Sequence, residues 1–202
     1  MGLSISVGLL YDQKRNDPEG YAHHRRAFDR LALALRAEGV DWGEPEITDP
    51  PTAHTHSGGF PYGDLMRLRR AYVLSPSSGE APLPPAPPVD GPAWRRDLER
   101  IEDETMMFAS HLLCHSDSSG YYVPVDFADP LFLPPESGVA GGGMVGSTHR
   151  LLQELDRVAA ALGAPDAVPA DGDPHAPERR ALHQLRAACR AGIAGGHALV
   201  FH

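Results

Sequence analysis

The stretch from Leu98 to Phe127 reads LERIEDETMMFASHLLCHSDSSGYYVPVDF, and it predicts a helix, a polar turn and a strand in that order. Apolar residues recur in its first half in steps of three and four, which places them on one face of a helix. This face is formed by Leu98, Ile101, Thr105, Phe108, Leu112 and His115. The short polar residues from Ser116 to Gly120 favour a turn that ends this helix.

Alternating apolar residues after the turn predict a strand from Tyr121 to Phe127. One face carries Tyr121 and the following odd-numbered residues, and the other carries Tyr122, Pro124 and Asp126. Because Pro124 has no backbone N–H to donate, we expect an edge strand or a bulged strand.

Working outward, further periodic segments predict two strands and four helices. The expected strands are Leu3–Tyr11 and Ala198–Phe201, with a weaker candidate at Val40–Ile47. The expected helices are Pro18–Glu38, Asp64–Leu74, Ser147–Leu162 and Pro177–Ala191. We therefore predict an α+β (or α/β) fold, in which a small mixed or antiparallel sheet packs with about five helices.

The chain is long enough, at 202 residues, to form a single compact domain, and we expect 1–202 to do so. Residues 75–92, SPSSGEAPLPPAPPVDGP, are too rich in proline for a helix or a central strand. We expect this segment to be a surface loop or an extended connector.

The charge and the hydrophobicity of the chain exclude several classes of function. A formal net charge of -9 argues against general binding of nucleic acid or of an anionic membrane. No apolar run approaches the ~20 residues that a spanning helix needs, and no signal segment is evident, so we expect a cytoplasmic protein. Cys114 and Cys189 lie in apolar helical contexts, where cysteine behaves as a small hydrophobic residue.

Two histidines stand one helical turn apart in HLLCH, and i, i+4 histidines can bind one metal ion. The candidate metal ligands are His111, His115 and Asp117, with zinc or another divalent transition metal as the ion. His149, or the loop pair His54 and His56, would supply a further ligand. The residue after the first histidine is Leu112, whereas zinc proteases carry a glutamate there as the general base.

The segment from Gly141 to Gly146 satisfies G-x-G-x-x-G before a helix that starts at Ser147. Such a pattern can bind phosphate through backbone amides. No convincing strand precedes it and no P-loop lysine follows, so we interpret these glycines as a flexible entry to the helix.

Two functions remain open. The first is a non-catalytic binding or interaction protein, immunity-like or inhibitor-like, with no cofactor and an unknown protein or small molecule as its partner. Its binding residues would be His115, Asp117, Tyr122 and Asp126, and no catalytic residue is assigned. The alternative is a metal-dependent hydrolase or metal-binding protein that uses His111, His115 and Asp117. A Cys114 nucleophile is disfavoured because no oxyanion hole is evident.

The segment from His115 to Gly120, HSDSSG, resembles a loose group of uncharacterised small bacterial proteins that carry an H-S-D-x-x-G corner between helix and strand. The resemblance covers about the C-terminal half of the chain, including Leu151–Leu155 and Ala198–Phe201. It implies a shared corner and no particular activity.

Overall fold

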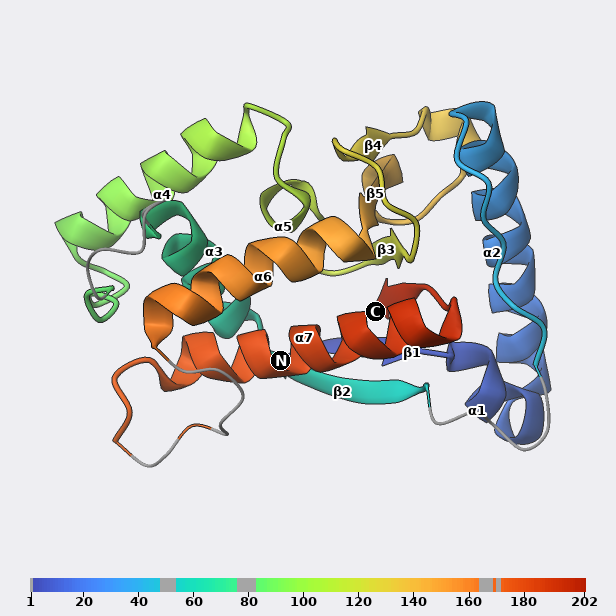
Figure 1. The fold of residues 1–202 in the computed structure, drawn as a ribbon, viewed down its shortest axis with the longest axis horizontal. Coiled ribbons are helices and arrows are strands. Elements are labelled where there is room, and N and C mark those ends of the chain that lie inside the picture. The colour runs from blue at the N-terminus through green and yellow to red at the C-terminus, as the bar shows by residue number, and fades with distance from the viewer. Residues whose placement is uncertain (1, 48–53, 76–82, 164–168, 170–171) are drawn as a thin grey trace.

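A computed structural model describes residues 2–47, 54–75, 83–163, 169 and 172–202. Its centre is a mixed sheet of six strands in the order β2-β1-β6-β3-β5-β4 (Figure 1). All neighbouring strands are antiparallel except β3 and β5, which are parallel. The strands are β1 (Gly2–Val7), β2 (His56–Pro61), β3 (Gly120–Val123), β4 (Leu131–Phe132), β5 (Met144–Ser147) and β6 (Leu199–Phe201).

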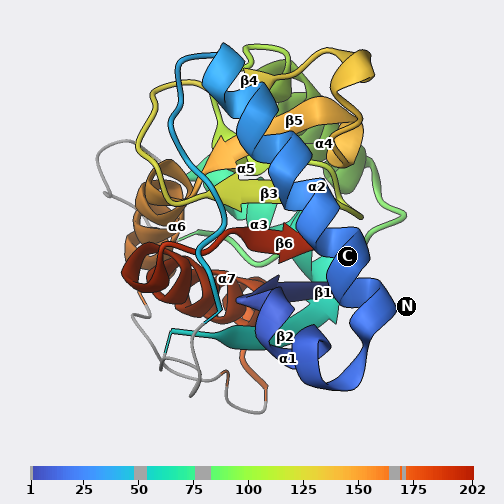
Figure 2. The ribbon, with the colours of Figure 1, turned by 90° about the vertical axis from the view of Figure 1, so that its right-hand side faces the viewer.

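Helices cover both faces of this sheet (Figure 2). Within the described residues these are α1 (Leu9–Asn16), α2 (Pro18–Ala37), α3 (Tyr62–Leu74), α4 (Pro92–Thr105), α5 (His111–Cys114), α6 (Thr148–Leu162) and α7 (Ala176–Gly195). Two short 3-10 turns, Pro135–Ser137 and Gly141–Gly143, lie between β4 and β5. The predicted α+β class with a mixed sheet in a single compact domain is confirmed.

Alternation along the strands divides the apolar core into two layers. Tyr122 of β3 packs with Leu151 and Leu185 beneath α6 and α7, whereas its neighbours Tyr121 and Val123 pack with the residues of α2 on the other face. The order is therefore helix layer, sheet, helix layer, with α2 alone forming most of one outer layer.

The long helix expected from Leu98 to His115 is wrong, because α4 ends at Thr105 and a separate turn of helix, α5, begins at His111. Phe108 between them has a φ of 54°, which no helix accommodates. The first amides of α5 are bonded by side chains: Ser110 Oγ accepts from Leu113 N–H at 3.1 Å. The Glu154 carboxylate accepts from the N–H groups of His111 and Leu112 at 2.9 and 2.7 Å. These contacts start a new helix in a new direction.

β3 is a central strand, which corrects the expected edge or bulged strand. It pairs with β6 on one side and with β5 on the other. Pro124 lies one residue beyond the end of β3 at Val123, so its missing N–H removes no ladder hydrogen bond.

The structure corrects three further expectations about strands and the segments beside them. The expected strand Leu3–Tyr11 stops at Val7, because Gly8 takes a left-handed conformation and α1 begins at Leu9. The glycines of G-x-G-x-x-G lead into the strand β5 before the helix, so they do not form a flexible loop. Val40–Ile47 forms neither helix nor strand, and it packs on the core through buried Val40 and Trp42.

Residues 76–82 of the proline-rich segment lie outside the described residues, and 83–91 form neither helix nor strand. Within the described part of the chain, no helix is both long and apolar enough to span a membrane.

Candidate partner-binding surface

His111, the first predicted metal ligand, is buried at the start of α5, and both of its ring nitrogens are bonded to backbone. Ser147 N–H donates to Nδ1 at 2.9 Å, so the proton resides on Nε2, which donates to the Ala128 carbonyl at 3.2 Å. Burial lowers the pKa of this imidazole, which favours the neutral form. The ring therefore joins α5 to β5 and to the segment after β3.

His115 is buried against the sheet and stacks on Tyr122. Its Nδ1–H donates to the Ser116 carbonyl at 2.9 Å, and burial lowers the pKa of the imidazole to about 3. The hydroxyl of Tyr122 donates to the His111 carbonyl at 2.9 Å. Two of the four predicted binding residues, His115 and Tyr122, thus lie inside the core.

The other two predicted binding residues, Asp117 and Asp126, are exposed, and each forms an ion pair with an arginine. Asp117 accepts from the buried Arg69 guanidinium, which also donates to the carbonyls of Leu112 and His115. Asp126 pairs with Arg150 of α6 at 2.6 Å. These two ion pairs order the corner between α5 and β3.

In the part of the chain that the structure describes, no group of three or more His, Cys, Asp or Glu side chains lies where it could hold one metal ion.

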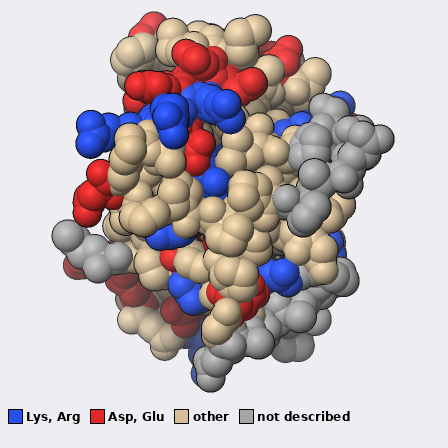
Figure 3. Space-filling model, turned by 90° about the vertical axis from the view of Figure 1, so that its left-hand side faces the viewer, with Lys and Arg blue, Asp and Glu red and all other residues tan. Residues whose placement is uncertain are grey.

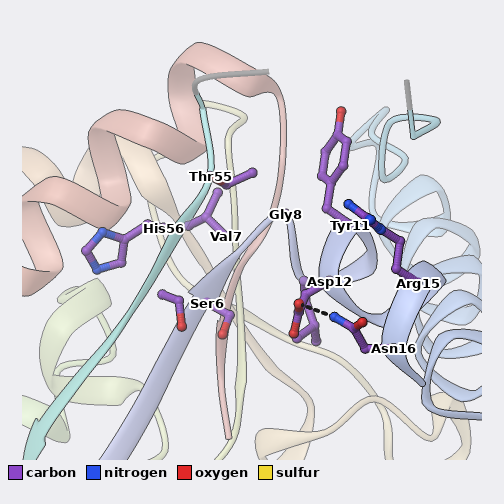
Figure 4. Close-up of a pocket in the computed structure, with 11 residues that line it drawn as sticks. Ser6, Val7, Gly8, Tyr11, Asp12, Arg15, Asn16, Thr55 and His56 are labelled. Carbon is purple, nitrogen blue, oxygen red and sulfur yellow. Dashed lines mark hydrogen bonds between the residues drawn. The ribbon is translucent and has the colours of Figure 1, made fainter. Parts of the chain in front are cut away.

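A pocket of about 670 Å³ lies between the end of β1, α1 and β2 (Figure 4). Tyr11, Asp12 and Arg15 of α1 form one wall, and Ser6 and Thr55 lie across from them. The Asp12 carboxylate already accepts a hydrogen bond from Asn16 at 2.9 Å. His56 points toward Gln184 of α7, 3.2 Å away. This pocket lies at the end of the molecule opposite α4 (Figure 1).

The helix α4 forms an outer edge of the molecule, and its charges are arranged against its dipole. Arg95 and Arg96 lie near the N-terminus, where negative charge is favoured, and three carboxylates occupy the last turns, where positive charge is favoured. These carboxylates belong to Glu102, Asp103 and Glu104, and all three are exposed. Since this order disfavours the helix, its acidic end is a candidate functional feature.

Figure 3 shows this end of the molecule, where acidic side chains gather across the upper part beside a row of basic ones. Among the described residues, none of Glu99, Glu102, Asp103 and Glu104 forms an ion pair. In contrast, Asp97 on the inner side of α4 pairs at 2.6 Å with the buried Arg70. Sequence reasoning assigned a function only to the histidines predicted at the end of this helix, and it treated residues 98–105 as a packing face. The signal that it missed was the run Glu-Asp-Glu at the end of the helix.

No curated protein and no solved structure matched the chain at a significant level. A family model described as "Putative DNA-mimic protein" matched residues 1–201. This match corrects both functional hypotheses from the sequence: an interaction protein of unassigned type, immunity-like or inhibitor-like, and a metal-dependent hydrolase. It also corrects the expected partner, an unspecified protein or small molecule, because the description specifies mimicry of DNA. The match spans nearly every residue, and the chain therefore belongs to this DNA-mimic family.

Proposed function

We propose that this protein acts as a DNA mimic that places the acidic end of α4 on the DNA-binding face of a protein and so excludes DNA from that face. The observation that carries the proposal is the set of exposed, unpaired carboxylates on α4 in a chain of this family. DNA-binding faces carry Lys and Arg side chains placed to contact phosphates, and carboxylates can accept from the same donors.

The spacing of the α4 carboxylates supports this role. From Glu99 to Glu104 the helix axis advances about 7.5 Å, and this span carries four carboxylates and Arg100, which is about one net negative charge per 2.5 Å of axis. Duplex DNA carries one charge per about 1.7 Å of its axis. Over this short length the helix therefore carries about two thirds of the charge density of duplex DNA.

The distribution of the arginines adds to the effect. Arg69 and Arg70 are buried, and they pair with Asp117 and Asp97. These two cations therefore pair with inner carboxylates, whereas the exposed arginines of α4 itself, Arg95, Arg96 and Arg100, form no described ion pair with the four outer carboxylates. With a net charge of -9, the protein also attracts a basic partner at long range.

The test is release of proteins from DNA-cellulose. Proteins of the source organism are bound to DNA-cellulose, and the column is then eluted with the purified chain at constant salt. We expect the wild-type chain to release at least one protein that binds duplex DNA when purified, and E102Q/D103N/E104Q to release much less of it.

A matched control removes three exposed carboxylates elsewhere, on and after α2, in E19Q/E38Q/E46Q. Both variants change the net charge equally, so a site on α4 predicts that only the first loses activity. If the wild-type chain releases no DNA-binding protein, the proposed function is wrong. Equal loss in both variants would show that net charge acts without a defined site.

A further inference from the structure

A patch of exposed apolar side chains lies directly beside the acidic end of α4. Seven large apolar residues are exposed among those that the structure describes, and four of them gather here. This apolar patch consists of Met106, Met107, Phe108 and Phe132, with exposed fractions of 66, 72, 50 and 51%. Monomeric proteins seldom expose apolar side chains in a group unless the group contacts a partner.

The backbone at Phe108 is held in a costly conformation at the centre of this patch. Its φ of 54° lies in the left-handed region, and Phe108 is the only non-glycine residue with a positive φ in the described ranges. Glycine would take this conformation freely, whereas a bulky aromatic residue is strained there. Phe108 thereby stands half-exposed, with its ring edge against Phe132 at a centroid distance of 5.4 Å. Strain of this kind concentrates at functional sites.

Carboxylates border the patch on two sides. Glu102, Asp103 and Glu104 precede it along α4, and Asp129 precedes β4 three residues before Phe132. All four are exposed and have no ion-pair partner within the described ranges. A partner that covers the patch must bring cations to this border, because a neutral or acidic one would leave these charges unpaired or repelled.

Resting on the proposed function, we infer that the patch receives an apolar side chain from the DNA-binding face of the partner. The partner class is a DNA-bending protein that inserts an apolar wedge between base steps and surrounds it with Arg and Lys. The apolar patch replaces the base faces that such a wedge contacts, and the carboxylates replace the neighbouring phosphates. Methionine suits this role because its unbranched side chain adapts to an irregular surface.

The test uses a purified nucleoid protein of this wedge-inserting class as the first probe and a lysine-rich peptide without apolar side chains as the second. Binding is measured over a range of salt concentrations. We expect M106Q/M107Q to bind the nucleoid protein at least about tenfold more weakly than wild type, mainly through faster dissociation. For this variant, the slope of log affinity against log salt concentration should equal that of wild type, because no charge has been removed. The lysine-rich peptide should bind both forms equally.

Two controls separate this inference from the proposed function. L33Q/V89T removes exposed apolar side chains elsewhere and should bind both probes as wild type does. E102Q/D103N/E104Q should bind both probes more weakly and with a shallower salt dependence. If M106Q/M107Q binds the nucleoid protein as tightly as wild type, the wedge contact is wrong. If the wild-type chain releases proteins from DNA-cellulose but does not bind this nucleoid protein, the partner class is wrong while the proposed function stands.

Discussion

The imidazole of His115 lies nearly parallel to the ring of Tyr122, with centroids 4.2 Å apart and an angle of 13° between the planes. The ring of Phe201 meets the same imidazole edge-on at 4.5 Å. His115 Nε2 is buried and has no hydrogen-bond partner in the described part of the chain. A second proton on this ring would therefore be a buried charge without a counterion.

Acidification should destabilise the fold through this residue. The pKa of His115 is about 3 in the folded chain and near 6.5 when exposed, so between these values the unfolded chain binds the additional proton. The free energy of unfolding then falls by up to about 1.4 kcal/mol per pH unit as the pH is lowered through this window. Urea denaturation at several pH values measures the slope.

His115→Asn isolates this contribution, because the amide does not titrate. Burial lowers the pKa of His111, which acts in the same direction, and burial raises the pKa of Glu154, which acts in the opposite direction. Both groups remain in the variant. A pH slope as steep in His115→Asn as in the wild-type chain would exclude His115 as its source.

Arg69 should contribute far more to stability than its partner Asp117. Arg69→Met leaves the carbonyls of Leu112 and His115 without their donor, and we expect a loss of roughly 2–4 kcal/mol in the free energy of unfolding. The Asp117 side chain is 52% exposed, so Asp117→Asn should cost less than about 1 kcal/mol. Chemical denaturation measures both values, and equal losses would contradict this assignment.

Removing the acidic end of α4 should stabilise the protein while it weakens partner binding. The variant E102Q/D103N/E104Q relieves unfavourable interaction with the helix dipole and should gain roughly 1 kcal/mol at low salt. Added salt should reduce the gain by screening. Glu19→Gln in the first turn of α2 is the matched control and should have the opposite sign. A triple variant less stable than wild type would show that these carboxylates have a structural role.

At position 108 a glycine variant should be more stable than an alanine variant, the reverse of the usual order. Both substitutions lose the contact with Phe132, but only glycine relaxes the left-handed backbone. We expect Phe108→Gly to be about 1 kcal/mol more stable than Phe108→Ala in thermal or chemical denaturation. If Phe108→Ala is the more stable, the strain is absent in solution.

Metal analysis tests the remaining cofactor expectation. Because both ring nitrogens of His111 are bonded to backbone groups, we expect protein purified without chelators to contain far less than one equivalent of zinc. Plasma mass spectrometry on wild type and His115→Ala measures this. Stoichiometric metal that disappears in the variant would contradict the expectation. The resemblance based on His115–Gly120 stays a prediction, since the description of the matched family does not mention that segment.

Local signals correctly predicted the elements that carry their own caps and periodicity. Asp17 accepts from Gly20 N–H at the start of α2, with Pro18 at its first position, and Ser147 caps α6 in the same way. The apolar composition of the last residues likewise located the strand at the end of the chain, where Val200 faces the opposite core from its two neighbours. These features depend on residues within one turn or one strand of each other, so the order of residues suffices.

Strand pairing and tertiary packing decided the elements that local signals did not predict. The segment His56–Pro61 has too many glycines to indicate a strand, and it becomes β2 only because β1 supplies its hydrogen-bond partners. The helix stripe from Leu98 to His115 is interrupted because Glu154, 39 to 56 positions away, bonds the amides that start α5. Asp97 and Glu99 look equivalent in the sequence, yet a buried arginine pairs with the first and leaves the second exposed. Charge is a property of the residues, but its availability to a partner depends on which cations the fold brings beside it.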